Sequence, residues 1–143
     1  MIGIDTSMLV CFEIEEHPLH NEARLLARDH AHEGFAIAPQ VLAEFIHVCT
    51  DPRRFERPLT MEDAGARSRR WWRATESTRV WPNDEAVSLF HEWMSSFRLG
   101  RRRLLDTMLA ATYRAAGVGA IATSDARDFA VFPGIHPVVL TSR

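Results

Sequence analysis

Residues 1–10 have the sequence MIGIDTSMLV, in which three apolar residues are followed at once by an acid and two hydroxyl residues. A short apolar run of this kind predicts a buried strand over residues 2–4 that stops at Asp5. The apolar residues from Met8 onward predict a helix that continues to about Glu15, with Thr6 or Ser7 as its cap. This stretch therefore predicts a strand that leads directly into a helix, with an acid at the junction.

The same alternation continues along the chain. We expect further short strands at residues 35–38, 79–81, 120–123 and 137–140. Helices are expected between them, at about residues 18–33, 40–50, 60–73, 82–100 and 104–116. Short apolar strands that alternate with helices are typical of an α/β domain with a mainly parallel sheet. We expect one domain over residues 1–143.

The composition excludes several classes of protein. The chain has 143 residues, of which 46% are hydrophobic and 25% are charged, as in ordinary globular domains. No apolar run approaches the roughly 20 residues that cross a bilayer. The N-terminus lacks a basic leader, and two cysteines, Cys11 and Cys49, cannot form a disulfide framework. We therefore expect a cytoplasmic protein without a membrane partner.

Charge is unevenly distributed along the chain. Residues 1–50 carry eight acids and two arginines, whereas residues 51–103 carry eight acids and twelve arginines. The chain contains no lysine, which excludes Schiff-base and P-loop chemistry. An arginine-rich middle in a mildly acidic protein suggests a localised face that binds anions.

Four acids occupy positions where this architecture binds ligands, because ligands of a parallel sheet lie at the carboxyl ends of its strands. Asp5 ends the first strand, and Asp125 follows the strand at residues 120–123. Glu44 lies at the edge of the apolar stripe of the helix after the second strand. Asp106 interrupts the apolar sequence LLDTMLAA, which is unfavourable unless the acid is paired or coordinated.

Carboxylates that converge on one cleft repel one another and raise one another's pKa. A divalent cation removes this conflict, and Mg²⁺ and Mn²⁺ prefer oxygen ligands. The acids lack companion histidines or cysteines in their segments, which favours phosphoryl chemistry. We therefore expect one or two Mg²⁺ or Mn²⁺ ions at a site formed by the four acids.

Four motifs in order resemble the PIN-domain family over the whole chain. They are IDTSMLV at the N-terminus, LAEF around Glu44, LLDTMLAATYRAAGV around Asp106 and TSDARDF at residues 123–129. The length and the TSDARDF…FPGI ending are most similar to the VapC-type toxins of bacterial toxin–antitoxin pairs. The resemblance implies a three-layer α/β/α fold with four to five short strands in the central sheet. It also implies a metal-dependent endoribonuclease, a homodimer and a cognate VapB-type antitoxin that blocks the cleft.

By motif position, Asp5, Glu44, Asp106 and Asp125 match the acidic quartet of this family. Many relatives have Asn where Asp125 stands and keep the Asp of the DF pair, here Asp128, so either residue or both serve as the fourth acid.

Two hydroxyl residues follow the first of these acids. The family often has Asn after Asp-Thr, where this chain has Ser7, a smaller group that could still hold Asp5 or a metal-bound water. Thr6 and Ser7 are therefore expected to support the site.

Two arginine-rich segments each have two interpretations. Arg98 and Arg101, Arg102 and Arg103 precede Asp106 and either contact RNA phosphates or form a solvated helix end. The arginines of residues 67–73, with Trp71 and Trp72, either grip RNA by charge and stacking or form an amphipathic helix with its tryptophans packed inward. The sequence favours the second interpretation of this helix.

Other functions account for the residues less well. A haloacid-dehalogenase-like phosphatase requires a second Asp two residues after the first, where Ser7 stands, and it typically uses a lysine. A receiver-like signalling domain needs adjacent acids after the first strand and a late lysine. A catalytically inactive PIN-fold binding module is a third alternative, against which the presence of all four acids counts.

Overall fold

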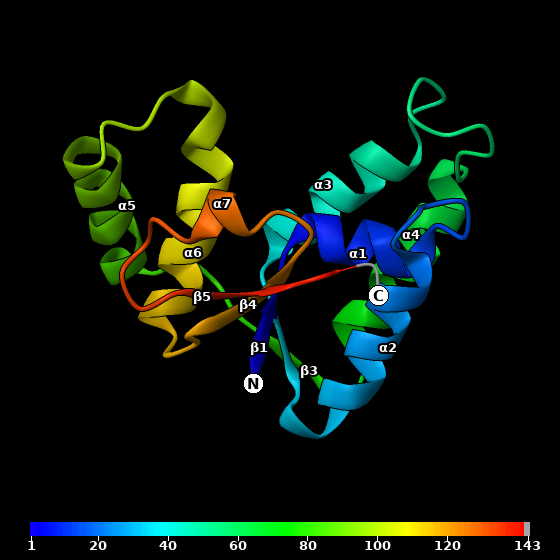
Figure 1. Cartoon of the computed structure of the whole chain (residues 1–143), viewed down its shortest axis with the longest axis horizontal. Helices are drawn as coiled ribbons and strands as arrows, with labels where there is room; N and C mark the ends of the chain where they lie inside the picture. The colour runs from blue at the N-terminus through cyan, green and yellow to red at the C-terminus, as the bar shows by residue number, and fades with distance from the viewer. Residues whose placement is uncertain (142–143) are drawn as a thin grey trace.

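The computed structural model describes residues 1–141, and five short strands form its centre (Figure 1). They are β1 (Ile2–Ile4), β2 (Phe35–Ile37), β3 (Ser77–Arg79), β4 (Ala120–Thr123) and β5 (His136–Val139). All neighbours pair in parallel, in the order β3-β2-β1-β4-β5. The prediction of a mainly parallel sheet of four to five strands is therefore confirmed.

Helices cover both faces of the sheet. They are α1 (Thr6–Glu13), α2 (His20–His30), α3 (Pro39–Cys49), α4 (Met61–Arg73), α5 (Asp84–Ser96), α6 (Leu104–Ala115) and α7 (Ala126–Phe129), with short 3-10 helices η1 (Ala31–Glu33) and η2 (Arg101–Arg103). Figure 1 shows α1 to α4 on one side of the strands and α5 to α7 on the other. This is the expected three-layer arrangement. Within the described residues, every helix is too short or too polar to cross a lipid bilayer.

The strand order places the start of α1 at the point of the sheet where the order of the strands reverses. The chain runs outward from β1 through β2 to β3, and then returns to place β4 on the other side of β1. When right-handed crossovers lead to opposite sides of one strand, their helices lie on opposite faces of the sheet. A crevice then lies between the two adjacent strands at which the order reverses, here β1 and β4. This crevice lies at the carboxyl ends of β1 and β4, where Asp5 follows β1.

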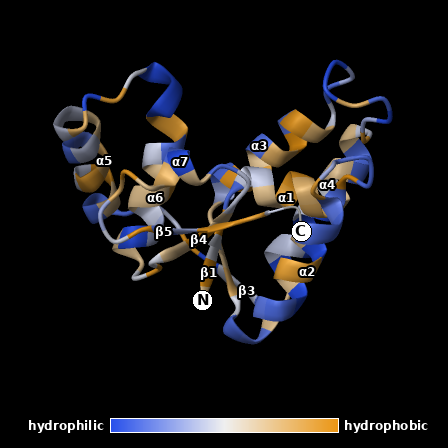
Figure 2. Cartoon of the chain, viewed as in Figure 1, coloured by the Kyte–Doolittle hydropathy of each residue, from blue (hydrophilic) through white to orange (hydrophobic). Residues whose placement is uncertain are grey.

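A close contact between α6 and β1 fixes the strand just before Asp5. A Cβ atom on Gly3 would lie 2.6 Å from Cδ2 of Tyr113, so only glycine leaves room for this ring. The Tyr113 hydroxyl donates a hydrogen bond of 2.6 Å to the Ile4 carbonyl. Both contacts are deep in the core, and Figure 2 shows that the neighbouring helix α1 is predominantly hydrophobic.

The structure corrects several predicted boundaries. The edge strand β3 lies at Ser77–Arg79 and precedes the apolar Val80 and Trp81 that suggested a strand at residues 79–81. The helix expected over residues 18–33 begins at His20 and changes to a 3-10 turn at its end. Asp5, in extended conformation, occupies the N-cap position of α1. Neither Thr6 nor Ser7 caps this helix, because Ser7 uses its hydroxyl in contacts with Asp5 and the end of β4.

Candidate active site

Asp5 is a buried carboxylate held by hydroxyl groups. Its residue is 8% exposed, and its Oδ2 atom accepts hydrogen bonds from Ser7 Oγ at 2.6 Å and from Thr123 Oγ1 at 2.8 Å. Burial raises the pKa of Asp5, and these hydroxyl donors partly oppose the increase. The side chain is therefore fixed in orientation while its charge has no cationic hydrogen-bond donor among the described residues.

The hydroxyl groups around Asp5 also join α1 to the end of β4. Ser7 Oγ lies 3.2 Å from Thr123 Oγ1 and accepts a hydrogen bond of 3.0 Å from the Ser124 backbone. Ser7 thus contacts Asp5, as its predicted supporting role requires. The Thr6 hydroxyl is buried and finds no hydrogen-bond partner in residues 1–141. Sequence reasoning missed Thr123, although it begins the TSDARDF motif.

Glu44 approaches the crevice from α3 and is half-buried. Gln40, one turn earlier, donates to Glu44 Oε1 at 3.3 Å and to the Leu105 carbonyl at 3.0 Å. Burial raises the pKa of Glu44, and the negative charge of Asp5 adds to the increase. No role was predicted for Gln40 from the sequence. Its spacing of four residues from Glu44 on one helix could have indicated the contact between the two side chains.

Asp106 lies in the first turn of α6 with its side chain 31% exposed. Its pKa is raised to about 6, first by burial and then by the charges of Asp5, Asp128 and Glu44, while Arg103 opposes the increase. These carboxylates therefore repel one another, as predicted for acids that converge from different elements.

The two candidates for the fourth acid differ in their surroundings. Asp125 is exposed, and its Oδ1 atom caps α7 by accepting a hydrogen bond of 3.0 Å from the Arg127 backbone. Asp128 is half-buried, and its charge raises the pKa of Asp106. Asp128 thus lies near enough to Asp106 for its charge to act on it, whereas Asp125 serves as a helix cap.

The donor set fits a hard divalent cation in chemistry, because it consists of carboxylate oxygens whose charges destabilise one another. In residues 1–141, however, no three His, Cys, Asp or Glu side chains lie close enough together to hold one metal ion. Asp5, Glu44 and Asp128 lie near enough for their charges to raise the pKa of Asp106, without forming a closed cage. Mg²⁺ typically binds one or two carboxylates and keeps several waters, so a complete cage is not required.

The predicted RNA-contacting arginines fall into two groups. Arg98, Arg101 and Arg102 are exposed. Arg103 instead turns inward, where its Nη2 atom donates to the Asp128 carbonyl and its guanidinium lies 5.8 Å from the centre of the Phe132 ring. Only the first group is available to a ligand from solvent without rearrangement.

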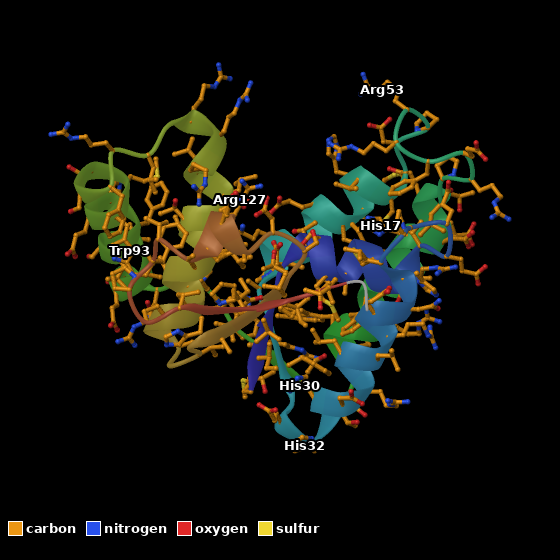
Figure 3. The ribbon with its side chains drawn as sticks, in the orientation of Figure 1. His17, His30, His32, Arg53, Trp93 and Arg127 are labelled. Atoms are coloured by element: carbon orange, nitrogen blue, oxygen red, sulfur yellow. The ribbon has the colours of Figure 1, made fainter. Side chains whose placement is uncertain are left out.

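His30 and His32 lie away from this crevice. Figure 3 shows His30 and His32 at one end of the molecule and Arg127, on α7, toward the other. His30 pairs with Glu33 through a contact of 2.7 Å between Nδ1 and Oε1. The site is therefore built from carboxylates and hydroxyls rather than from these imidazoles.

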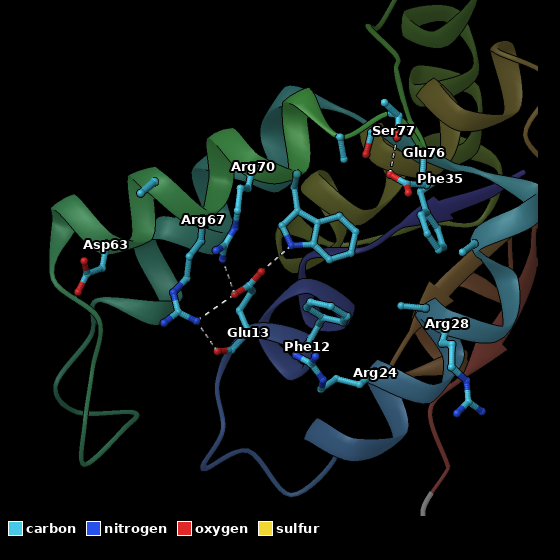
Figure 4. A pocket seen from close by; sticks show the side chains of 16 residues that line it. Phe12, Glu13, Arg24, Arg28, Phe35, Asp63, Arg67, Arg70, Glu76 and Ser77 are labelled. Atoms are coloured by element: carbon cyan, nitrogen blue, oxygen red, sulfur yellow. Dashed lines mark hydrogen bonds and ion pairs between the residues drawn. The ribbon is translucent and has the colours of Figure 1, made fainter.

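A second charged cluster surrounds Glu13 at the far end of α1 (Figure 4). Glu13 accepts hydrogen bonds from Arg67 at 2.9 Å and from the Trp71 indole at 2.8 Å, and Arg70 lies 3.5 Å away. Trp71 is 9% exposed and packs edge-to-face on Phe12. The interpretation of this segment as an amphipathic helix is confirmed for Trp71, which is buried and unable to stack on RNA.

Comparison with known proteins identifies similar chains. The family model described as PIN domain matches residues 2–134 of this chain. Proteins named Ribonuclease VapC24 from two strains of Mycobacterium tuberculosis are each 29% identical over 136 residues, which cover 92% of this chain and 91% of theirs.

Solved structures share the fold. Mycobacterium tuberculosis VapC20, described as a sarcin–ricin-loop-cleaving toxin, superposes with a TM-score of 0.69 at 16% identity over 96% of this chain and 100% of its own. VapBC2 from Rickettsia felis, bound to a DNA fragment from its promoter, gives 0.69 at 16% identity over 97% and 98% of the two chains. A toxin–antitoxin complex from Klebsiella pneumoniae gives 0.65 at 16% identity with both chains covered completely.

Proposed function

Because the chain belongs to the PIN-domain family, we propose that it is an endoribonuclease that hydrolyses RNA phosphodiester bonds and acts as the toxin of a type II toxin–antitoxin pair. A similar protein that spans nearly the same length is named a ribonuclease, which supports the activity. The similar folds include a toxin and complexes of toxins with antitoxins, which supports the cellular role.

The observation that carries the proposal is the group of acids at the crevice between β1 and β4. Asp5, Glu44, Asp106 and Asp128 come from four different segments, and the pKa of Asp106 is raised to about 6 by burial and by the charges of the other three. Like charges arranged in this way destabilise the fold unless a bound cation compensates them, and such arrangements are typical of functional sites. A cationic ligand that also binds phosphate accounts for this arrangement.

We assign the following roles to the residues. Asp5 and Asp106 hold one or two Mg²⁺ or Mn²⁺ ions, and Glu44 and the fourth acid, Asp128 or Asp125, complete the site directly or through water. A bound divalent cation supplies positive charge against the phosphate and makes a nearby water more acidic. Ser7 and Thr123 keep the Asp5 carboxylate in one orientation through their hydroxyls. Arg98, Arg101 and Arg102 contact RNA phosphates beside the crevice.

The hydrolysis joins a water oxygen to phosphorus and breaks the bond from phosphorus to the 3′ oxygen of the preceding nucleotide. The 3′ oxygen takes up a proton, so the products carry 5′-phosphate and 3′-hydroxyl ends. The RNA 2′-hydroxyl takes no part as a nucleophile. A product with a 2′,3′-cyclic phosphate would refute this mechanism.

Two partners follow from the toxin role. We propose that a VapB-type antitoxin blocks the acidic crevice and that the chain forms a homodimer. A small neighbouring gene that encodes a partly disordered DNA-binding protein, and whose product suppresses toxicity on co-expression, would support the pairing.

The activity can be tested with the purified chain. We expect it to cleave structured RNA with Mg²⁺ or Mn²⁺, and to lose cleavage on chelation and in Asp106→Asn. Asp29→Asn is the matched control, since Asp29 is an exposed acid on α2 that pairs with Arg28. End-group analysis of the fragments identifies the chemistry. RNA binding without cleavage under all these conditions would instead indicate an inactive PIN-fold binding module.

A further inference from the structure

Arg103 differs from its neighbours in the Arg101–Arg103 turn because its side chain points into the protein. Its Nη2 atom donates a hydrogen bond to the Asp128 carbonyl, and its guanidinium packs over the Phe132 ring. Its own backbone carbonyl accepts a hydrogen bond of 2.6 Å from the Thr107 hydroxyl. Arg101 and Arg102, by contrast, are exposed. The three consecutive arginines therefore do not share one role.

These contacts connect two separate segments that carry acids. Asp106 is one turn after Arg103, at the start of α6, whereas Asp128 belongs to α7, which follows β4. α7 has only four residues and packs against α6 and β5. A helix this short has little stability of its own, so its position depends on contacts such as those that Arg103 makes with Asp128 and Phe132.

The guanidinium lies beside the Asp106 carboxylate without forming a close pair with it. Arg103 Nε is 3.5 Å from Asp106 Oδ2, and this buried Nε atom finds no hydrogen-bond partner in residues 1–141. Charge-assisted pairs that neutralise a carboxylate are shorter, at about 2.7–2.9 Å. Arg103 is thus anchored mainly by α7 and Phe132, which leaves the Asp106 oxygens available to another ligand.

We propose that Arg103 is a positioning residue of the acid site: it ties the segment that bears Asp128 to the first turn of α6, so that Asp106 and Asp128 face the same cation. This inference rests on the proposed function for the identity of that cation. It also revises the role expected for Arg103 from the sequence, because an inward-facing guanidinium positions carboxylates rather than RNA phosphates.

Binding of Mn²⁺ alone to the full chain, measured by calorimetry, distinguishes positioning from simple charge. Arg103→Met keeps the length and the apolar stem but removes the charge and the donors. By Coulomb's law alone, loss of a cation from an acid site makes Mn²⁺ bind more tightly. Loss of positioning makes it bind more weakly, by about ten- to a hundredfold, as for other residues that orient metal ligands. Equal or tighter binding in Arg103→Met would overturn the proposal.

Two control variants bracket this result. Arg127→Met removes an exposed arginine from α7, the helix that Arg103 contacts, and should leave Mn²⁺ binding unchanged. Arg101→Met should weaken RNA binding and flatten its salt dependence, with kcat retained. Arg103→Met should do the reverse, lowering kcat with little change in KM. A flattened salt dependence with normal kcat in Arg103→Met would identify it as a phosphate contact instead.

Hydrogen exchange supplies a measurement that needs neither metal nor RNA. Arg103→Met should accelerate amide exchange in residues 126–132, whereas Arg127→Met should not. A wild-type chain that neither binds Mn²⁺ nor cleaves RNA would contradict the proposed function. In that event, unchanged exchange in Arg103→Met would also refute the tether between α6 and α7, and faster exchange would support it.

Discussion

The two ends of α1 each bear a buried carboxylate, and the two carboxylates differ in how far neighbouring side chains compensate their charge. Asp5 precedes the helix and is 8% exposed, whereas Glu13 ends it and is 7% exposed. Glu13 accepts hydrogen bonds from Arg67 and the Trp71 indole, with Arg70 nearby. Among residues 1–141, the side chains that donate to Asp5 are the neutral hydroxyls of Ser7 and Thr123, and the charge of Asp5 raises the pKa of Glu44 and of Asp106.

This difference separates a structural charge, that of Glu13, from the charge of Asp5, for which we propose a functional role. Burying a carboxylate is unfavourable unless the charge is compensated, and the protein compensates Glu13 from its own side chains. It compensates Asp5 only in part, and adds further acids around it. The end of α1 at Asp5 therefore leaves negative charge that the proposed cation would compensate, whereas the end at Glu13 holds α1 against α4.

Changing each carboxylate to its amide gives the most direct test of this contrast. Asp5→Asn should lower RNA cleavage by about 10²–10³-fold, the range for loss of one group that stabilises charge at a reacting centre. Its thermal midpoint should not fall, because the variant loses a poorly compensated buried charge. Initial rates and thermal unfolding measure both effects. Cleavage at the wild-type rate would remove Asp5 from the site.

Glu13→Gln should show the opposite pattern. Two guanidinium groups lose their carboxylate, and we expect the free energy of unfolding to fall by about 2–3 kcal/mol, below the full value for a buried pair because both arginines reach solvent. Urea unfolding measures this loss. The cleavage rate per folded molecule should be unchanged, and a large fall in that rate would break the division between the two ends of α1.

The contrast can be sharpened at the fourth acid. Asp128→Asn should lower kcat by about tenfold, since a carboxylate near Asp106 is lost. Asp125→Asn should have a smaller effect, because Asn caps a helix about as well as Asp. Steady-state cleavage by the two variants ranks them. A larger loss in Asp125→Asn would assign the fourth position to Asp125.

The smallest effect concerns pH and the stability of the chain measured without metal. Asp106 has a folded-state pKa of about 6, above its ordinary value of 3.8, so the folded state binds the proton more tightly. Its contribution to the free energy of unfolding therefore falls as pH rises from about 4 through about 6. Asp106→Asn should be about 1–2 kcal/mol more stable than wild type at pH 7.5, after allowance for its partial exposure.

Urea unfolding at several pH values tests this prediction. The difference between Asp106→Asn and wild type should shrink toward pH 4, where both side chains are uncharged. A variant that is less stable than wild type at pH 7.5 would contradict the repulsion among the acids.

The fold was predictable where apolar runs are buried. β1 and β4 lie at the predicted residues and β2 within one residue, because their side chains point into the core. The prediction failed at β3, whose edge position leaves polar Thr78 and Arg79 exposed, so that the neighbouring Val80 and Trp81 gave a misleading signal. α7 was not predicted, since four residues are too few to show a helical period.

The candidate acids and the support of Asp5 by Ser7 were predictable from the sequence, whereas the supports from distant segments were not. Strand ends in a parallel sheet meet at one edge, so the positions of Asp5 and Asp125 follow from topology alone. The contacts of Thr123 with Asp5, and of Arg103 with the Asp128 carbonyl, depend on how distant segments pack. No local pattern encodes that packing, which is also why the sequence left both candidates for the fourth acid open.

The contact between Gly3 and Tyr113 makes the position of Asp5 depend on a residue in the core, and random mutagenesis would reveal this dependence. Any side chain at position 3 must displace the Tyr113 ring, whose hydroxyl holds the carbonyl of Ile4, the residue before Asp5. Alanine at this buried glycine therefore disturbs the backbone that aims Asp5 without touching a polar group. In a library screened for inactive clones, codon 3 should be recovered alongside codon 5, although glycine has no chemistry of its own to contribute.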